Sequence, residues 1–192
     1  MGLSGTVAGQ PTSFLPSPGA LGRPVRVIAQ LLLLVFPFAM LYAATMDVLT
    51  MRIANRVSLG LVAAFPVVAL IAGMPAQQML MHFGVGAAVL LANMLLFQLR
   101  LVGGGDAKLI AAAALWIGYE QLVPFLVYVT IFGGALALFL LVYRRAPAAA
   151  LPLPEWAVRL HKPREGMPYG VAIAAGALVV YPMTTLPSLL AG

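Results

Sequence analysis

The sequence contains no cysteine and very few charged residues, and each shortage excludes a class of function. Without cysteine, disulfide bonds, thiolate metal sites and cysteine nucleophiles are impossible. The two histidines, His82 and His161, do not have the spacing of metal ligands such as H-E-x-x-H. We therefore expect no metal and no cofactor. Charged residues make up 8% of the chain, against about 25% in soluble proteins, so an ordinary soluble domain is excluded as well.

Most of the chain is apolar instead. Of its 192 residues 62% are hydrophobic, and the mean hydropathy is +1.02. These residues come in continuous runs, as in helices that cross a bilayer with about 20 residues, and not in the alternating pattern of a membrane β-barrel. We predict an all-α polytopic membrane protein, a bundle of about six transmembrane helices, over residues 27–46, 57–73, 79–99, 107–119, 122–142 and 170–190.

The predicted helices form one domain. Residues 27–190 are expected to be a single membrane-embedded unit, because the loops between the helices are short apart from the segment 143–169. Residues 1–26 are rich in Gly, Pro, Ser and Thr, and we interpret them as a loose arm. The long loop 143–169 carries five prolines, and residues 155–160 within it are predicted to form a brief interfacial helix.

Basic residues are distributed unevenly over the two sides of the predicted bundle. The loops after the first, third and fifth helices hold nine of the 11 Lys and Arg residues, whereas the other side holds only Arg23 and Arg26. The positive-inside rule then places the N-terminus outside and the basic loops in the cytoplasm. The net charge of +6 thus reflects membrane topology. Because no basic patch is interleaved with aromatic residues, we expect the lipid bilayer, and not nucleic acid, as a partner.

Asp47 and Asp106 are the only aspartates in the chain, and each lies where an apolar run meets a short basic loop. A charged side chain at the centre of a membrane helix costs about 2.5–3.5 kcal/mol on insertion scales, so it is usually paired, hydrated or functional. The apolar run after Asp106 has only about 14 residues, or about 21 Å, against a hydrocarbon core of about 30 Å. Either another part of the protein completes the crossing, or Asp106 lies below the membrane surface in a water-filled recess, which would be the active site.

The charge distribution places both aspartates on the cytoplasmic side, and we predict that they form a catalytic pair. One ionised carboxylate can take a proton from water while a protonated partner donates a proton to the carbonyl oxygen of a peptide bond. Two neighbouring carboxyl groups share one proton, as this mechanism requires. Gly103, Gly104 and Gly105 suit such a site, because glycines accept positive φ angles and let a substrate backbone approach closely.

Other interpretations of the same residues remain open. Asp106 could be the N-cap of a helix that follows a glycine turn. Asp47 could form a structural ion pair with Arg52, Arg56 or Lys108. The two acids could also relay protons in a small proton- or ion-coupled transporter, although the chain lacks the paired broken helices of such folds.

Three motifs carry a resemblance to a known family. Gly103-Gly104-Gly105-Asp106-Ala107-Lys108-Leu109 resembles the GxGD signature of the membrane-embedded aspartyl peptidases, specifically the type IV prepilin peptidases. Asp47 with the downstream Arg52-Ile53-Ala54-Asn55 is similar to that family's first aspartate and its I-P-N motif, with Ala54 in place of the usual proline. Met167-Pro168-Tyr169-Gly170 looks like the opening of its last helix.

The resemblance implies an endopeptidase of the bacterial inner membrane that removes the leader of type IV (Flp-like) prepilins at the cytoplasmic face. Its partner would be a membrane-anchored prepilin or pseudopilin, and Asp47 and Asp106 would be the catalytic pair. Lys108 is expected to orient a loop or a substrate carbonyl, with contact to lipid headgroups as its alternative. The supporting residues that the resemblance implies are Gly103, Gly104, Gly105, Lys108, Asn55, Pro168, Tyr169 and Gly170.

Longer relatives also methylate the new pilin end through a cysteine-bearing cytoplasmic domain between their first two helices. Here that loop has about ten residues and the chain has no cysteine. The resemblance is therefore to the short type without a methyltransferase domain, and we expect peptidase activity without N-methylation. An inactive factor of pilus assembly and protein secretion is a further alternative, which the presence of both aspartates disfavours.

Overall fold

The computed structural model describes residues 28, 30–145, 154–161 and 166–191, and within these ranges its elements are all helical. The all-α prediction is confirmed, whereas the arm predicted over residues 1–26 lies outside the described residues. In chain order the elements are α2 (Val35–Thr50), α3 (Asn55–Ile71), α4 (Ala76–Gln98), α5 (Gly104–Ile117), α6 (Leu122–Tyr143), α7 (Glu155–His161), α8 (Tyr169–Val180), the 3₁₀ turn η4 (Tyr181–Met183) and α9 (Thr185–Ala191).

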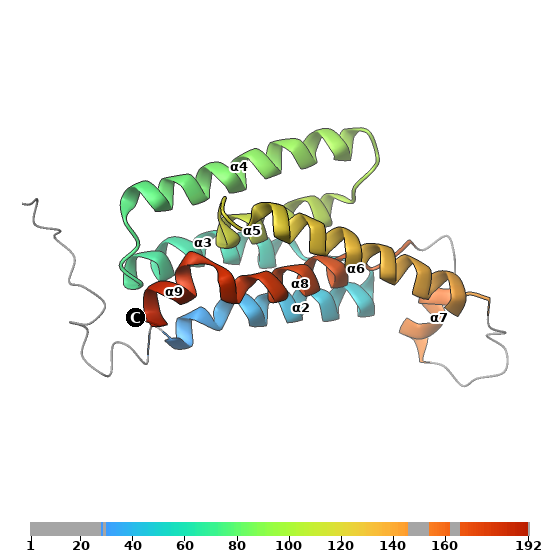
Figure 1. The fold of residues 1–192 in the computed structure, drawn as a ribbon. Helices are drawn as coiled ribbons and strands as arrows, with labels where there is room; N and C mark the ends of the chain where they lie inside the picture. The colour runs from blue at the N-terminus through green and yellow to red at the C-terminus, as the bar shows by residue number, and fades with distance from the viewer. Residues whose placement is uncertain (1–27, 29, 146–153, 162–165, 192) are drawn as a thin grey trace, which may run out of the picture.

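The short helix α5 is the centre of the bundle. It contacts α3, α4, α6 and α8, and in Figure 1 α4 runs along one edge of the bundle while α2 runs along the opposite edge. Every residue of α5 from Leu109 to Ile117 is buried. The run of four alanines in its middle, residues 111–114, lets the neighbouring helices approach closely. α5 therefore holds the other helices together.

Among the residues that the structure describes, four helical segments are long and apolar enough to cross a membrane: Gln30–Thr50, Ala76–Gln98, Leu122–Tyr143 and Tyr169–Leu189. The protein is thus a multi-pass membrane protein. α3 and α5 have 17 and 14 residues, about 26 and 21 Å at 1.5 Å per residue, which is less than the hydrocarbon core of about 30 Å. Helices occur at all six predicted positions, but these two are too short to span the membrane fully by themselves.

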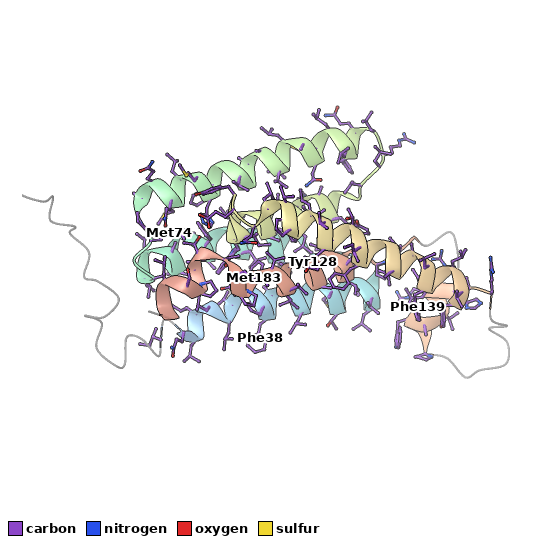
Figure 2. All side chains as sticks on the ribbon, viewed as in Figure 1. Phe38, Met74, Tyr128, Phe139 and Met183 are labelled. Carbon is purple, nitrogen blue, oxygen red and sulfur yellow. The ribbon has the colours of Figure 1, made fainter. Side chains whose placement is uncertain are left out.

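The outer surface of the bundle is apolar. Figure 2 shows side chains such as Phe38 and Phe139 projecting away from the helices that carry them, and these two are 65% and 61% exposed. α4 buries only His82, Gly86 and Asn93 along its 23 residues. An exposed apolar surface of this extent is stable next to lipid and not next to water.

An aromatic cluster fills the core at the end of the bundle where α5 finishes. Trp116 stacks on Phe36, lies edge-on to Phe65 and contacts Tyr181. The polar atoms in this cluster have partners: the Trp116 indole N–H donates to the Leu61 carbonyl at 3.0 Å. The Tyr181 hydroxyl donates to the carbonyl of residue 33 at 3.0 Å. This end is therefore well packed and its polar groups are satisfied.

Two of the predicted helices differ from the structure. The helix predicted over residues 170–190 is broken into α8, η4 and α9, because Pro182 has no N–H to donate and the chain forms a 3₁₀ turn there. The first helix continues to Thr50 instead of ending at residue 46, so Asp47 lies inside its last turn. The short helix predicted over 155–160 is confirmed as α7, which Arg159 ties to the Leu49 carbonyl of α2 at 2.6 Å.

Candidate active site

Three helix ends meet at the end of the bundle opposite the aromatic cluster. Because successive long helices run antiparallel, the last turn of α2 lies at the same end as the first turns of α5 and α8 (Figure 1). α2 stops at Met51, which adopts a left-handed conformation with φ 54° and donates its N–H to the Asp47 carbonyl at 2.8 Å. The fold thus gathers all three predicted motifs at one place.

Asp47 is 5% exposed, and its carboxylate Oδ2 accepts a hydrogen bond from the Gly170 N–H at 2.7 Å. Gly170 lies in the first turn of α8, where backbone N–H groups have no partner within the helix. The positive end of the α8 dipole also points toward this carboxylate. Asp47 therefore caps a helix that begins 122 residues later in the chain, and negative charge on it is stabilised by that helix.

Asp106 lies in the first turn of α5 and is half-buried. The N-cap of this helix is Gly103, so the alternative in which Asp106 is the N-cap residue is wrong. Its carboxylate turns back over Gly103: a Cβ on that glycine would stand 2.7 Å from Asp106 Oδ2. Asp47 lies nearby, because Ile53 packs against both Gly105, which precedes Asp106, and Gly170, which binds Asp47. The two predicted acids are thus brought into one site.

The glycines before Asp106 differ from the expectation in one respect. None of them has a positive φ; Gly103 is extended, with φ −69°. These glycines therefore do not use the positive φ angles that their residue type accepts. What these positions need is space, because a Cβ on Gly104 would stand 3.3 Å from the Phe97 ring and a Cβ on Gly105 would stand 3.2 Å from the Ile53 Cβ. Close helix packing explains these glycines better than backbone conformation does.

Lys108 and Asn55 are also brought together. The Lys108 ammonium donates to Asn55 Oδ1 at 3.1 Å and so joins the start of α3 to α5. Within the described part of the chain no ion pair joins Asp47 to Lys108 or to the arginines of the neighbouring loop, Arg52 and Arg56. The alternative in which Asp47 forms a structural ion pair is therefore wrong for this fold.

Ala54 departs from the proline that the resemblance leads one to expect, yet the turn is preserved. Ala54 is the N-cap of α3 with φ −68° and ψ 130°, and proline is locked at a φ of about −65°. The backbone therefore takes the conformation that a proline would impose. The substitution leaves the path of the chain after Asp47 unchanged.

The third motif opens α8. Pro168 is its buried N-cap, and Tyr169 follows as the first helical residue. The Tyr169 ring lies against Gly133 of α6, where a Cβ would stand 2.6 Å from the ring. Tyr169 also lies within electrostatic reach of Asp106. The contact with Gly133 was not foreseen, because a glycine in an apolar run gives no sign of which ring it accommodates.

An open groove of about 570 Å³ adjoins the site at the loop between α4 and α5. Gly103, which touches the Asp106 carboxylate, is one of its lining residues. The others are Phe97, Gln98, Arg100, Leu101 and Val102. The groove reaches Gly103, beside the Asp106 carboxylate, but neither aspartate lines it. The sequence did not predict it, because its shape depends on how α4 turns into α5.

The site offers carboxylates and backbone groups but no metal cage. Within the described ranges no group of three His, Cys, Asp or Glu side chains could hold a metal ion. Two acids that are close together and partly removed from water are suited to moving protons to and from a bound water.

One comparison with known proteins identifies a family. A model of the type IV leader peptidase family matches residues 34–138, a stretch that includes both aspartates and the start of α3. No curated protein sequence matches the chain, and no solved structure matches it.

Proposed function

Because the chain belongs to the type IV leader peptidase family, we propose that it is a membrane-embedded aspartyl endopeptidase that removes the leader peptides of type IV (Flp-like) prepilins. The family supports a prepilin leader peptidase activity in general. The proposal adds the catalytic residues, the type of substrate and the side of the membrane. It rests chiefly on the meeting of Asp47 and Asp106 at the ends of α2 and α5.

The two carboxyl groups divide the work of hydrolysis. The ionised one takes a proton from water as the water oxygen attacks the carbonyl carbon of the scissile bond, and the protonated one donates its proton to the carbonyl oxygen. The tetrahedral intermediate then collapses: the second group, now a carboxylate, takes a proton back from a hydroxyl of the intermediate as the C=O bond re-forms. The C–N bond breaks, and the departing amine takes up the proton that the first carboxyl removed from water, so the pair again holds one proton. Because the charges of the two groups interact, the pair favours the state with a single proton that this cycle requires.

Basic residues support a cytoplasmic site. Arg52, Arg100, Lys108 and Arg144 all lie at the end of the bundle that holds the two aspartates. The positive-inside rule assigns such an end to the cytoplasm, which for a bacterial protein corresponds to the inner face of the inner membrane. We propose that residues 27–190 form one peptidase domain and that the loop 143–169 lies on this side.

We propose that this enzyme does not methylate the new N-terminus of the pilin. Only residues 51–54 separate α2 from α3, which leaves no room for a further domain at that point, and the chain has no cysteine. The new N-terminus of the pilin is therefore expected to leave this enzyme unmethylated, and mass spectrometry of the processed pilin tests this.

A proton- or ion-coupled transporter is the alternative from another class, and family membership argues against it. Protein reconstituted in liposomes separates the two functions. The peptidase cleaves a co-reconstituted prepilin and leaves an imposed pH gradient in place. Collapse of the gradient without cleavage would favour the transporter.

The catalytic assignment is tested with Asp47→Asn and Asp106→Asn. Each substitution removes the ability to take or give the proton while keeping the shape of the side chain, so we expect both proteins to insert normally and to lose cleavage of a membrane-anchored prepilin. Glu120→Gln is the matched control, because Glu120 is an exposed acid in the turn between α5 and α6, at the opposite end of the bundle. Cleavage at the wild-type rate by either Asn variant would exclude the pair.

A further inference from the structure

Ile53 occupies the space between the two helices that open at the site. It lies in the turn between α2 and α3, and it is half-buried. Its Cβ lies 3.2 Å from the position that a Cβ on Gly105 would take, and its Cδ1 lies 3.0 Å from the corresponding position on Gly170. The Ile53 side chain therefore contacts the first turn of α5 through Cβ and the first turn of α8 through Cδ1.

Each of these two glycines supports one aspartate. Gly105 directly precedes Asp106 in α5. Gly170 donates its N–H to Asp47 Oδ2 at 2.7 Å, and a Cβ on it would stand 2.8 Å from the same oxygen. A change in the volume of Ile53 therefore moves the supports of both acids at once.

The turn that carries Ile53 is held on both sides. Before it, the Met51 N–H is bonded to the Asp47 carbonyl at 2.8 Å; after it, Asn55 is bonded to Lys108 of α5 at 3.1 Å. Isoleucine branches at Cβ and has few χ1 rotamers, so its length is well defined. A stiff side chain on a fixed turn suits the role of a spacer.

We propose that Ile53 is a positioning residue that sets the separation of the Asp47 and Asp106 carboxyl groups by spacing the first turns of α5 and α8. This role rests on the proposed function, because the separation matters only if the two acids share a proton and a water. Catalysis is sensitive to such spacing, since a displacement of about 1 Å costs on the order of 100-fold in rate.

A series of truncations tests the proposal. Ile53→Val removes only Cδ1, the atom that reaches Gly170, whereas Ile53→Ala also removes both Cγ atoms and leaves Cβ, the atom nearest Gly105. We expect kcat to fall by about tenfold and about 100-fold respectively, with KM within about twofold of wild type. The partial retention in Ile53→Val is itself part of the expected result.

Ile71→Ala is the matched control. Ile71 is also half-buried but closes the far end of α3, so the same atoms are lost away from the site. A merely structural effect lowers the amount of folded protein in both alanine variants and leaves kcat per folded molecule unchanged. If kcat of Ile53→Ala equals that of Ile71→Ala, Ile53 is not a positioning residue.

A second measurement does not depend on activity. The chain has no cysteine, so Asp47→Cys combined with Asp106→Cys gives a protein whose only thiols stand at the two positions. Thiol cross-linkers of graded length should give one preferred length with Ile53 present and a spread of shorter lengths with Ile53→Ala. Identical profiles in the two backgrounds overturn the proposal. If wild-type protein fails to cut prepilin, the proposed function fails, while the cross-linking profile still decides whether Ile53 sets the spacing.

Discussion

The two ends of the bundle are built in opposite ways. At the aromatic end the polar atoms of Trp116, Tyr181 and His82 each meet a backbone carbonyl, at 3.0, 3.0 and 2.8 Å. At the other end two acids share one partly buried space. The glycines around them are packed so closely that an added Cβ would press against a neighbouring atom. The first arrangement stabilises the fold, whereas the second is the one that the proposed catalysis requires. We infer that stability and activity are separable along the length of this bundle.

The largest effect on stability is expected at the aromatic end. Trp116→Ala removes the largest fully buried side chain and leaves the Leu61 carbonyl without its donor. Losses of about 3–5 kcal/mol are typical for such truncations. Trp156→Ala is the matched control, because Trp156 is 39% exposed, and its cost should be about 0.5 kcal/mol or less. Denaturant titrations in detergent measure both. A large loss of cleavage per folded molecule in Trp116→Ala would contradict the separation of the two ends.

Gly170→Ala, at the end that holds the two aspartates, should lower activity and not stability. The added Cβ would stand 2.8 Å from Asp47 Oδ2 and 3.0 Å from Ile53 Cδ1, so the capping bond and the carboxylate must shift. We expect cleavage to fall by about 100-fold, which corresponds to about 2.7 kcal/mol of transition-state stabilisation. Gly60→Ala is the control, since a Cβ there meets nothing within 4 Å. A Gly170→Ala enzyme that cuts at the wild-type rate would show that Asp47 need not be held by α8.

Gly133→Ala tests whether the position of the Tyr169 ring, which packs against Gly133, matters for cleavage. A Cβ at Gly133 would stand 2.6 Å from the Tyr169 ring, whereas the next residue, Gly134, has open space at the same place. Displacing the ring should lower cleavage by about tenfold, or about 1.4 kcal/mol, while Gly134→Ala leaves it unchanged. Equal rates for the two neighbours would mean that Tyr169 has no part in the site.

The smallest effect is expected for the contact between Asn55 and Lys108. Both side chains are exposed, and a hydrogen bond of this kind contributes about 1 kcal/mol or less. Asn55→Ala and Lys108→Ala should each cost no more than this, and the double variant should cost less than their sum, because the two changes remove the same bond. Fully additive losses would mean that the contact does not fasten α3 to α5.

The sequence contained enough to find the two aspartates but not their surroundings. An acid that adjoins an apolar run can be recognised from the sequence alone, because charged residues are rare in such runs. The order and positions of the helices followed from the apolar runs for the same reason. The break at Pro182 was missed, since the surrounding run is apolar enough to be taken for one helix.

The contacts that shape the site could not be predicted in this way. Ile53 meets Gly105 and Gly170, which are separated from it by long stretches of chain, and only the packing of three helices brings them together. The three glycines before Asp106 were expected to suit the site because glycines accept positive φ angles. In the structure, two of them, Gly104 and Gly105, instead leave space for the Phe97 and Ile53 side chains. Sequence patterns therefore identified the two candidate acids, and tertiary packing determines how they are held.

The claim that Asp47 and Asp106 act as one unit is tested most directly by the single-turnover rate of prepilin cleavage in Asp47→Asn, in Asp106→Asn and in the double variant. Groups that share one catalytic step lose their effect together, so removing both should cost no more than removing either. We predict the same background rate in all three proteins, with normal membrane insertion. Losses that multiply in the double variant, or a single variant that keeps the wild-type rate, would contradict a shared catalytic pair.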